Sequence, residues 1–454
     1  MIHRYRFDDL NIVLDVNSGA VHLAGDAAYR ALAFFETAAD ADAGAAAASA
    51  ALAAEFPEAA LAEALSEIRT LIDEGTLFSE EAPLADEAIT GRGAVVKALC
   101  LHVAHDCNMS CRYCFADDGA FDGQRTLLPA ETGKRAIDFL LTHSGNRRRL
   151  EIDFFGGEPL LNFPVVKALV AYARARERDF GKHIGFTITT NGLLLDAEKE
   201  AFCNAHMDNV ILSMDGRPEV HDAMRKTAGG GPTYASVLKN HKRFVQNREG
   251  KHYVRGTFTR HNLDFSEDVR HLADLGFRNI SAEPVVAGED RDFALREADL
   301  PRILAEYDRL AAFCLARERS GEGISFFHFN VDLERGPCVF KRIAGCGAGT
   351  EYVAVSPEGD LYPCHRFVGN PAFRMGGLHD ATFENPFYEV FNRAHVQSKP
   401  DCRACWAKFH CGGGCHANAW QMNGDILKPY ALGCALERKR VECAIGIRAA
   451  LIED

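Results

Sequence analysis

Three cysteines with iron-binding spacing lie in one short segment. Cys107, Cys111 and Cys114 follow the pattern Cys-x3-Cys-x2-Cys. Three thiolates suit an iron–sulfur cubane and leave one of its irons without a protein ligand. That open iron can chelate the amino and carboxylate groups of a bound cofactor. A zinc knuckle is the alternative, but no fourth ligand stands at finger spacing, since His105 is only two residues before Cys107.

A second, denser group of cysteines occupies the C-terminal part of the sequence. Its members are Cys346, Cys364, Cys402, Cys405, Cys411, Cys415 and Cys434. A group of this size is unlikely to arise by chance and indicates metal binding, with a zinc ribbon as one possibility. Cys338 lies just upstream, and the role of Cys443 is open. The cysteines expected to pack as small apolar residues within strands or helices are Cys100, Cys203 and Cys314.

The elements that must position the first group alternate between strand and helix patterns from residue 95 to about residue 320. The expected strands are 97–103, 149–155, 184–190, 209–214, 252–259 and 279–286. Helices are expected between them, for example at 129–142 and 163–178. Six such units predict a parallel sheet curved into an open barrel, with its chemistry at the carboxyl ends of the strands.

The first cysteine group follows the first of these strands and resembles the signature of the radical S-adenosylmethionine (SAM) superfamily. Short motifs at the ends of the next three strands agree with this resemblance. They are Gly156-Gly157-Glu158-Pro159, Thr190-Asn191-Gly192 and Ser213-Met214-Asp215-Gly216. The resemblance implies that Cys107, Cys111 and Cys114 hold a [4Fe–4S] cluster that cleaves SAM.

The same resemblance implies roles for the residues around SAM. Tyr113 packs near the adenine, and Glu158 accepts a hydrogen bond from the SAM ammonium. The other implied SAM-binding residues are Gly156 and Gly157 at the methionine end, and Thr190, Asn191 and Ser213 near the ribose and carboxylate. Arg225 and Arg255 are candidates for the SAM carboxylate, with a structural ion pair as an equal alternative for each arginine.

The C-terminal cysteines resemble the SPASM domain of radical SAM peptide-modifying enzymes, which holds two auxiliary [4Fe–4S] clusters. The resemblance implies that Cys402, Cys405, Cys411 and Cys434 hold the outer cluster. It implies that Cys346, Cys364 and Cys415 hold the inner cluster, with Cys338 as its candidate fourth ligand. With the SAM-cleaving cluster, the expected total is three [4Fe–4S] clusters.

The first 90 residues have the character of a separate small domain. Strand-like runs flank a turn at 17–19, helical stretches follow at 27–38, 46–54 and 58–74, and a short strand is expected at 76–78. This order suggests a winged helix, followed by a linker over 79–94. The segment carries four Arg, no Lys and 17 Asp or Glu, which equals the net charge of −13 of the whole chain. Such acidity repels nucleic acid and suits a peptide with some basic character.

Longer segments narrow the resemblance. Residues 11–22, 347–364 and 411–419 are similar to maturases of SCIFF peptides, a name that stands for six cysteines in forty-five residues. These enzymes join a Cys sulfur to a carbon of a downstream residue, usually Thr, as a thioether. The resemblance also implies a Cys-rich precursor peptide with a leader, and an electron donor such as flavodoxin or ferredoxin.

The expected fold is therefore α/β, with a partial (β/α)6 radical SAM barrel between two smaller domains. A winged-helix-like domain that recognises the leader spans 1–90, the barrel spans 91–325, and an Fe–S-rich SPASM domain spans 326–454. Maturases that form formylglycine or carbon–carbon links share the cluster motifs and are the alternative enzymes. An Fe–S DNA-binding sensor is the alternative of another class, and the acidic first domain argues against it.

The cellular location is inferred from what the sequence lacks. It contains no apolar stretch of membrane-spanning length, and its first residues have no apolar signal core. We therefore expect a cytoplasmic protein with no membrane partner. In a reducing compartment its 15 cysteines favour metal binding over disulfides.

Overall fold

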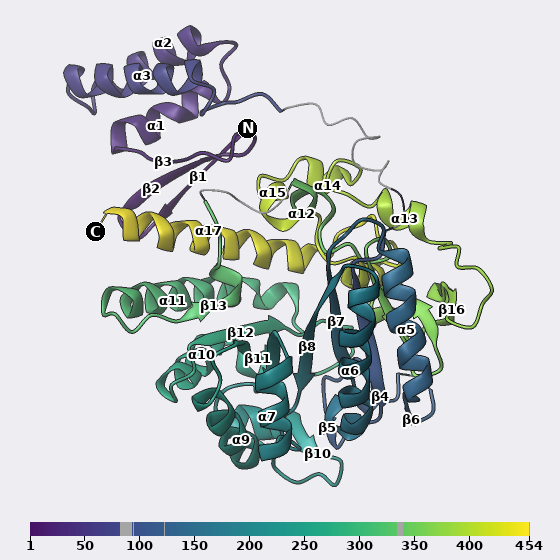
Figure 1. Cartoon of the computed structure of the whole chain (residues 1–454). Coiled ribbons are helices and arrows are strands. Elements are labelled where there is room, and N and C mark those ends of the chain that lie inside the picture. Colours follow the sequence, from purple (N-terminus) through teal and green to yellow (C-terminus); the bar gives the residue numbers. More distant parts are fainter. Residues whose placement is uncertain (82–92, 94, 122, 334–338, 454) are drawn as a thin grey trace.

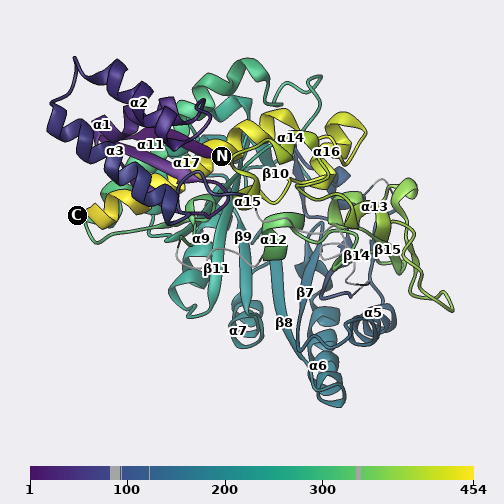
Figure 2. The same cartoon turned by 90° about the horizontal axis from the view of Figure 1, so that it is seen from above.

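The computed structural model of the chain describes residues 1–81, 93, 95–121, 123–333 and 339–453. The N-terminal elements form a lobe of their own, and the strand–helix repeat forms the body of the molecule (Figure 1). Seen from above, the N-terminal lobe lies over one side of that body (Figure 2).

The N-terminal lobe contains an antiparallel sheet of order β1-β2-β3 and three helices. The elements are β1 (Ile2–Phe7), β2 (Leu10–Asp15), β3 (Val21–Leu23), α1 (Asp26–Phe35), α2 (Ala41–Leu52) and α3 (Glu58–Asp73). The hairpin and the three helices agree with the prediction, whereas β1 was not predicted. The strand expected at 76–78 is wrong. The amides of Thr76 and Leu77 donate to the carbonyl of Leu71 and close the end of α3 instead.

The body of the molecule is a parallel sheet whose six central strands are those predicted from the sequence. In spatial order they are β4 (Ala98–His105), β7 (Arg149–Gly156), β8 (His183–Thr190), β9 (Asn209–Ser213), β11 (Lys251–Phe258) and β12 (Asn279–Pro284). Every residue of β4 is buried, as expected for a strand covered on both faces. The two-residue strand β13 (Ser325–Phe326) extends the sheet beyond β12.

Helices cover the outside of the barrel and bury their apolar faces against the sheet. They are α5 (Ala130–His143), α6 (Phe163–Asp179), α7 (Ala197–His206), α8 (Pro218–Met224), α9 (Tyr234–Gln246), α10 (Phe265–Asp274) and α11 (Leu300–Arg319). Two short strands, β5 (Met109–Cys111) and β10 (Arg225–Thr227), pair with each other, and β6 (Thr126–Leu127) pairs with β4. Single 3-10 turns lie at Asp117–Gly119, Pro159–Asn162, Arg260–Asn262, Glu297–Asp299 and Phe327–Phe329.

The C-terminal segment continues the barrel sheet. Strand β14 (Tyr352–Val355) pairs in parallel with β4, and β15 (Asp360–Tyr362) and β16 (Gly376–Gly377) follow as antiparallel neighbours. Its short helices are α12 (Val339–Ala344), α13 (Tyr388–Asn392), α14 (Pro400–Arg403), α15 (Lys408–Cys411) and α16 (His416–Asn423), with 3-10 turns at His365–Phe367 and Pro371–Phe373. The shared sheet fixes the C-terminal segment relative to the barrel.

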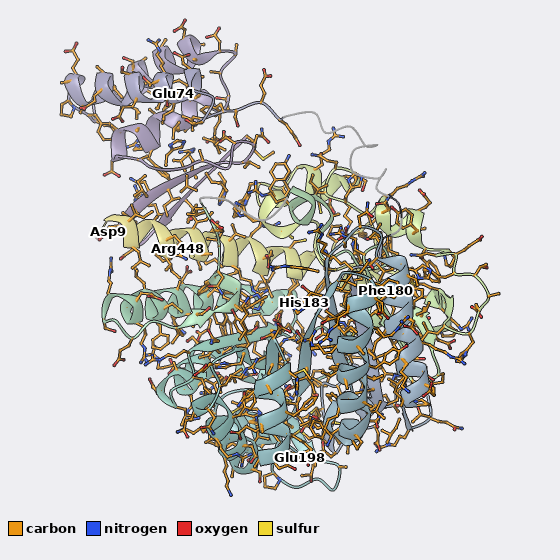
Figure 3. The ribbon with its side chains drawn as sticks, viewed as in Figure 1. Asp9, Glu74, Phe180, His183, Glu198 and Arg448 are labelled. Carbon is orange, nitrogen blue, oxygen red and sulfur yellow. The ribbon has the colours of Figure 1, made fainter. Side chains whose placement is uncertain are left out.

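A long final helix, α17 (Ala431–Glu453), joins all three parts. This helix was not predicted from the sequence. Ile12 and Leu14 of β2 pack on Val441 and Ile445 of α17, and α11 lies along the helix on another side. Because the helix is buried on several sides, its sequence has no single apolar stripe from which the helix could be predicted. Figure 3 shows Asp9, in the β1–β2 turn, beside the end of α17 that carries Arg448.

Within the ranges that the structure describes, no helix combines the length and the apolar character needed to span a bilayer.

Candidate active site

One cavity of about 850 Å³ lies at the carboxyl ends of the barrel strands, between the barrel and the C-terminal segment. The SAM-site residues predicted from the sequence that line it are Cys107, Cys111, Cys114, Tyr113, Gly156, Gly157, Thr190, Asn191, Ser213, Arg225 and Arg255. The predicted auxiliary ligands that line it are Cys346, Cys364, Cys411, Cys415 and Cys434. Residues more than 300 positions apart in the sequence thus face one space.

The first cysteine group is held at one end of this cavity. Cys111 is in β5, whose pairing with β10 places it opposite Arg225. The Cys107 sulfur accepts from the amide of Met109 at 3.4 Å and from Asn191 Nδ2 at 3.7 Å. Burial raises the pKa of Cys107 to about 12 and that of Cys111 to about 11. With such raised pKa values these thiols are protonated near neutral pH rather than free thiolates.

Gly156 and Gly157 allow the end of β7 to pack directly on the cysteine loop. A Cβ on Gly156, whose φ is +129°, would lie 2.2 Å from the carbonyl oxygen of Ala104. A Cβ on Gly157 would lie 2.3 Å from the carbonyl oxygen of Asp106. The two glycines are thus required for the backbone packing that shapes this end of the cavity.

Glu158 lies behind the cavity wall and is fully buried. Its carboxylate accepts from the amide of Leu160 at 3.0 Å, from Thr190 Oγ1 at 2.8 Å and from the amide of Asn191 at 2.7 Å. Burial raises its pKa to about 7, while these hydrogen bonds act in the opposite direction. The structure therefore shows Glu158 holding the Thr190–Asn191 turn, and its contact with the SAM ammonium stays a prediction.

Tyr113 and Arg225 are both tied to Asp215, a buried residue that follows β9. Tyr113 donates its hydroxyl proton to Asp215 Oδ2 at 2.5 Å, and Arg225 Nε donates to Oδ1 at 3.0 Å. The Arg225 guanidinium also lies 5.4 Å from the centre of the Tyr113 ring. Arg225 therefore makes the structural ion pair that was one of its two predicted roles, while its side chain still borders the cavity.

A second cavity, of about 200 Å³, lies in the C-terminal segment. It is lined by all four cysteines predicted to hold the outer cluster: Cys402, Cys405, Cys411 and Cys434. Among the described residues, no three His, Cys, Asp or Glu side chains converge closely enough to share one metal ion. Each iron of a cubane takes one protein thiolate, so this wider arrangement fits a cluster better than zinc. Cys338 lies outside the described residues.

Comparison with known families agrees with this arrangement. Residues 101–276 match the Radical SAM superfamily, and residues 346–406 match SPASM, an iron-sulfur cluster-binding domain. The chain therefore has the radical SAM fold with a C-terminal SPASM domain. The matched ranges contain the first cysteine group and the barrel in one case, and Cys346, Cys364, Cys402 and Cys405 in the other.

Several curated relatives are similar over most of their length. The mycofactocin maturase of Mycobacterium ulcerans is 27% identical over 70% of this chain and 83% of its own. The PqqA peptide cyclase of Gluconobacter oxydans is 24% identical over 77% of this chain and 93% of its own. The cysteine-type anaerobic sulfatase-maturating enzyme of Clostridium perfringens is 24% identical over 68% of this chain and 85% of its own.

Two solved structures share the fold. Native anSMEcpe with bound AdoMet superposes with a TM-score of 0.65 at 19% identity, over 79% of this chain and 99% of that one. Streptococcus suis SuiB bound to its precursor peptide SuiA superposes with a TM-score of 0.55 at 15% identity, over 95% of this chain and 100% of that one. Because the SuiB match covers 95% of this chain, the similarity in fold includes the N-terminal lobe.

Sequence reasoning missed four charged residues that line the cavity: Glu283, Arg366, Glu437 and Arg440. Arg255 Nε lies 3.6 Å from Glu283 Oε1. Burial raises the pKa of Glu283, but His328 and Arg255 outweigh burial and hold it well below its usual value. On α17, Glu437 and Arg440 follow Cys434 at three-residue spacing, a helical signal that places all three on one face.

Four other described cysteines line neither cavity. Cys100, Cys203, Cys314 and Cys443 are buried in β4, α7, α11 and α17. The Cys443 sulfur donates to the carbonyl of Tyr307 at 3.7 Å. Their burial agrees with the packing role predicted for the first three and gives Cys443 the same role in the interface of α17 with α11.

The Glu158 contacts lead to a test of the radical SAM site. Replacing Glu158 with Gln exchanges one acceptor oxygen for an NH2 donor. One of the three groups that donate hydrogen bonds to the carboxylate then loses its acceptor. We expect the iron content to stay unchanged and SAM affinity to fall roughly 10–150-fold, as for the loss of a charge-assisted hydrogen bond of about 1.5–3 kcal/mol. Equilibrium SAM binding measures this. Thr190→Val is the comparison variant, because it removes one of the same hydrogen bonds and keeps the carboxylate, so it should weaken SAM binding less than Glu158→Gln does. Unchanged SAM affinity in Glu158→Gln would show that Glu158 serves only to cap the following turn.

Proposed function

We propose that the chain is a peptide maturase that joins a Cys sulfur to a carbon of a downstream residue, usually Thr, in a Cys-rich SCIFF precursor. The observation that carries the proposal is one cavity whose lining includes both the SAM-site cysteines and Cys346, Cys364 and Cys415. The relatives named as maturases and peptide cyclases support a peptide substrate. The thioether specificity rests on the resemblance of residues 11–22, 347–364 and 411–419 to SCIFF maturases.

Removal of a hydrogen atom from an unactivated carbon is beyond any protein side chain. A [4Fe–4S] cluster with SAM supplies that chemistry when both are bound. The cysteines proposed to hold this cluster are Cys107, Cys111 and Cys114, and the proposed SAM contacts are Tyr113, Gly156, Gly157, Glu158, Thr190, Asn191, Ser213, Arg225 and Arg255. The chain contributes a preformed site in which Asp215 fixes Tyr113 and Glu158 fixes the Thr190–Asn191 turn.

The middle of the cavity is suited to an extended peptide. Arg440 donates from Nε to the Tyr307 hydroxyl at 2.8 Å, and its Nη2 has no partner among the described residues. Half-exposed Arg255, which also lines the cavity, is available to peptide carbonyl oxygens. Glu283 and Glu437 offer acceptors to peptide amides. These side chains would orient the target carbon toward the SAM end and the Cys sulfur toward the opposite end.

The atom and electron balance explains why cysteines are needed at both ends. Thioether formation removes the thiol proton and one hydrogen atom from the target carbon, and one further electron must leave. We propose that the inner cluster, held by Cys346, Cys364 and Cys415, is the acceptor of that electron. Cys402, Cys405, Cys411 and Cys434 would hold the outer cluster, which would offer that electron a route out to an oxidised carrier protein. An electron donor such as flavodoxin or ferredoxin would supply the one electron that SAM cleavage consumes. Three clusters are thus proposed in total.

The N-terminal lobe supports the peptide assignment. Strand β3 pairs only with β2 among the described residues, so its other edge is open to an added strand. We propose that residues 1–90 bind the precursor leader there, which concentrates the core peptide at the cavity of the domain over 91–325 and the SPASM domain over 326–454.

Mass spectrometry of the peptide product tests the proposal. The reconstituted, reduced chain is incubated with SAM and a synthetic Cys-rich precursor, and the product is then alkylated with iodoacetamide. Each thioether should lower the peptide mass by two hydrogens and remove one alkylatable thiol. A carbon–carbon link would also remove two hydrogens but leave every thiol alkylatable. Formylglycine formation would remove sulfur from the peptide at a Cys, and at a Ser it would remove two hydrogens and leave an aldehyde that a hydrazide reagent labels. Either of these products would replace the thioether assignment by the corresponding alternative.

A further inference from the structure

Lys399 is a fully buried lysine in the SPASM domain, with an exposed fraction of 0%. It directly precedes α14, the helix that carries Cys402. Its Nζ donates to the carbonyl of Gly413 at 2.9 Å, and His416 Nδ1 lies 3.5 Å away. Among the described residues, no carboxylate forms an ion pair with it. A buried ammonium without a counter-charge is costly, so this position calls for a negative charge nearby.

The surroundings of Lys399 point to the source of that charge. Gly413 belongs to the Cys411-Gly-Gly-Gly-Cys415 loop, in which all three glycines have positive φ. In the proposed assignment, Cys411 is a ligand of the outer cluster and Cys415 is a ligand of the inner cluster. The Lys399 ammonium therefore contacts the short backbone link between the two auxiliary sites. Burial lowers the pKa of Lys399, whereas Cys402, Cys411, Cys415 and Cys346 act to raise it when they are thiolates.

Another buried lysine in the same domain shows the contrast. Lys408 has an exposed fraction of 2%, and its Nζ lies 3.0 Å from Glu81 Oε2. Lys408 thus has the carboxylate partner that a buried lysine ordinarily requires. Lys399 has none among the described residues, although it is buried at least as deeply.

We infer that Lys399 is an electrostatic positioning residue that, from its contact with the loop between Cys411 and Cys415, favours the reduced forms of the two auxiliary clusters. The inference rests on the proposed auxiliary clusters and assigns a residue that controls electron flow between them. A cubane held by thiolates becomes more negative on reduction, so a fixed positive charge beside it raises its reduction potential. Because the ammonium contacts the link between both sites, removing its charge should affect both clusters.

The test is a redox titration followed by electron paramagnetic resonance, with dithionite as the reductant. It uses the full chain with Cys107, Cys111 and Cys114 replaced by Ala, so that only auxiliary clusters contribute. Lys399→Met should shift the reduction equilibrium toward the oxidised form by at least about tenfold, or about 59 mV more negative for a one-electron couple. Lys399→Arg keeps the charge and should restore the parent potential. Lys239→Met, at an exposed position of α9, is the control and should leave the potential unchanged.

The outcomes separate this inference from the proposed function. If the parent protein binds no auxiliary clusters, the proposed function fails before Lys399 is tested. If the clusters are present and Lys399→Met keeps the parent potential, the inference about Lys399 is wrong and the proposed function is untouched. Lys399→Gln, which keeps a hydrogen-bond donor, covers the case in which the Met variant loses iron. Loss of iron in both Met and Gln variants but not in the Arg variant supports the role of the charge, and equal loss in all three overturns it.

Discussion

A variant with Cys107, Cys111 and Cys114 all replaced by Ala is expected to retain about eight of about twelve irons per chain and to cleave no SAM. The expectation follows because the variant changes no predicted ligand of either auxiliary cluster: the predicted inner ligands Cys346, Cys364 and Cys415 line the main cavity as a separate set of thiols, and Cys402 and Cys405 line a different cavity. Iron analysis after anaerobic reconstitution and chromatography of SAM products measure both effects.

The chain offers a matched control for this variant. Cys314→Ala also removes a thiol, but Cys314 is buried in α11 and lines neither cavity. It should keep the full iron content and normal SAM cleavage. Zinc in place of iron in the parent protein, or normal SAM cleavage by the triple variant, would contradict the cluster assignment.

Replacing Leu23 with Pro is expected to weaken leader binding at least about tenfold while leaving the clusters intact. Backbone hydrogen bonds join Asp15 to Ala20 and Asn11 to Ala24 across β2 and β3. Because amides alternate in direction along an antiparallel strand, the N–H of Leu23 points away from β2, toward the open edge. Proline removes that donor without breaking the β2–β3 pairing. Fluorescence anisotropy of a labelled leader peptide measures the affinity of each variant for the leader.

Leu23→Ala separates the backbone effect from the side-chain effect, since it keeps the N–H. Its leader affinity should stay close to that of the parent protein. With full precursor, Leu23→Pro should raise KM for crosslinking more than it lowers kcat, because docking concentrates the core peptide and takes no part in the chemistry. Parent-like leader affinity in Leu23→Pro would show that the leader does not pair with β3. We favour this variant over removal of residues 1–90, because that removal would expose the face of α17 that packs on Ile12 and Leu14.

The strand ends of the barrel were predictable from the sequence because local signals mark them. Each central strand is a short apolar run, and the motifs at 107–114, 156–159 and 190–192 follow those runs directly. Parallel strands bring their carboxyl ends to one edge, so the sequence order of the motifs already implied their meeting in space.

The opposite wall of the cavity was not predictable in the same way. It depends on β14 pairing with β4 and on α17 reaching back over the barrel, and both contacts join residues far apart in the sequence. No local pattern signals that Glu437 and Arg440 will face Arg255 and Glu283. The role of Asp215 was likewise hidden, because a turn Asp gives no sign that a distant Tyr and Arg will share its carboxylate.

The central claim is that one cavity presents the target carbon of the peptide to the SAM end and the Cys sulfur to the SPASM end. Its most direct test is a precursor whose predicted target Thr carries deuterium on its carbons. The account predicts that the adenosyl product released from SAM gains one deuterium for each thioether formed, as read by mass spectrometry. Thioether formation with no deuterium in that product would contradict the account.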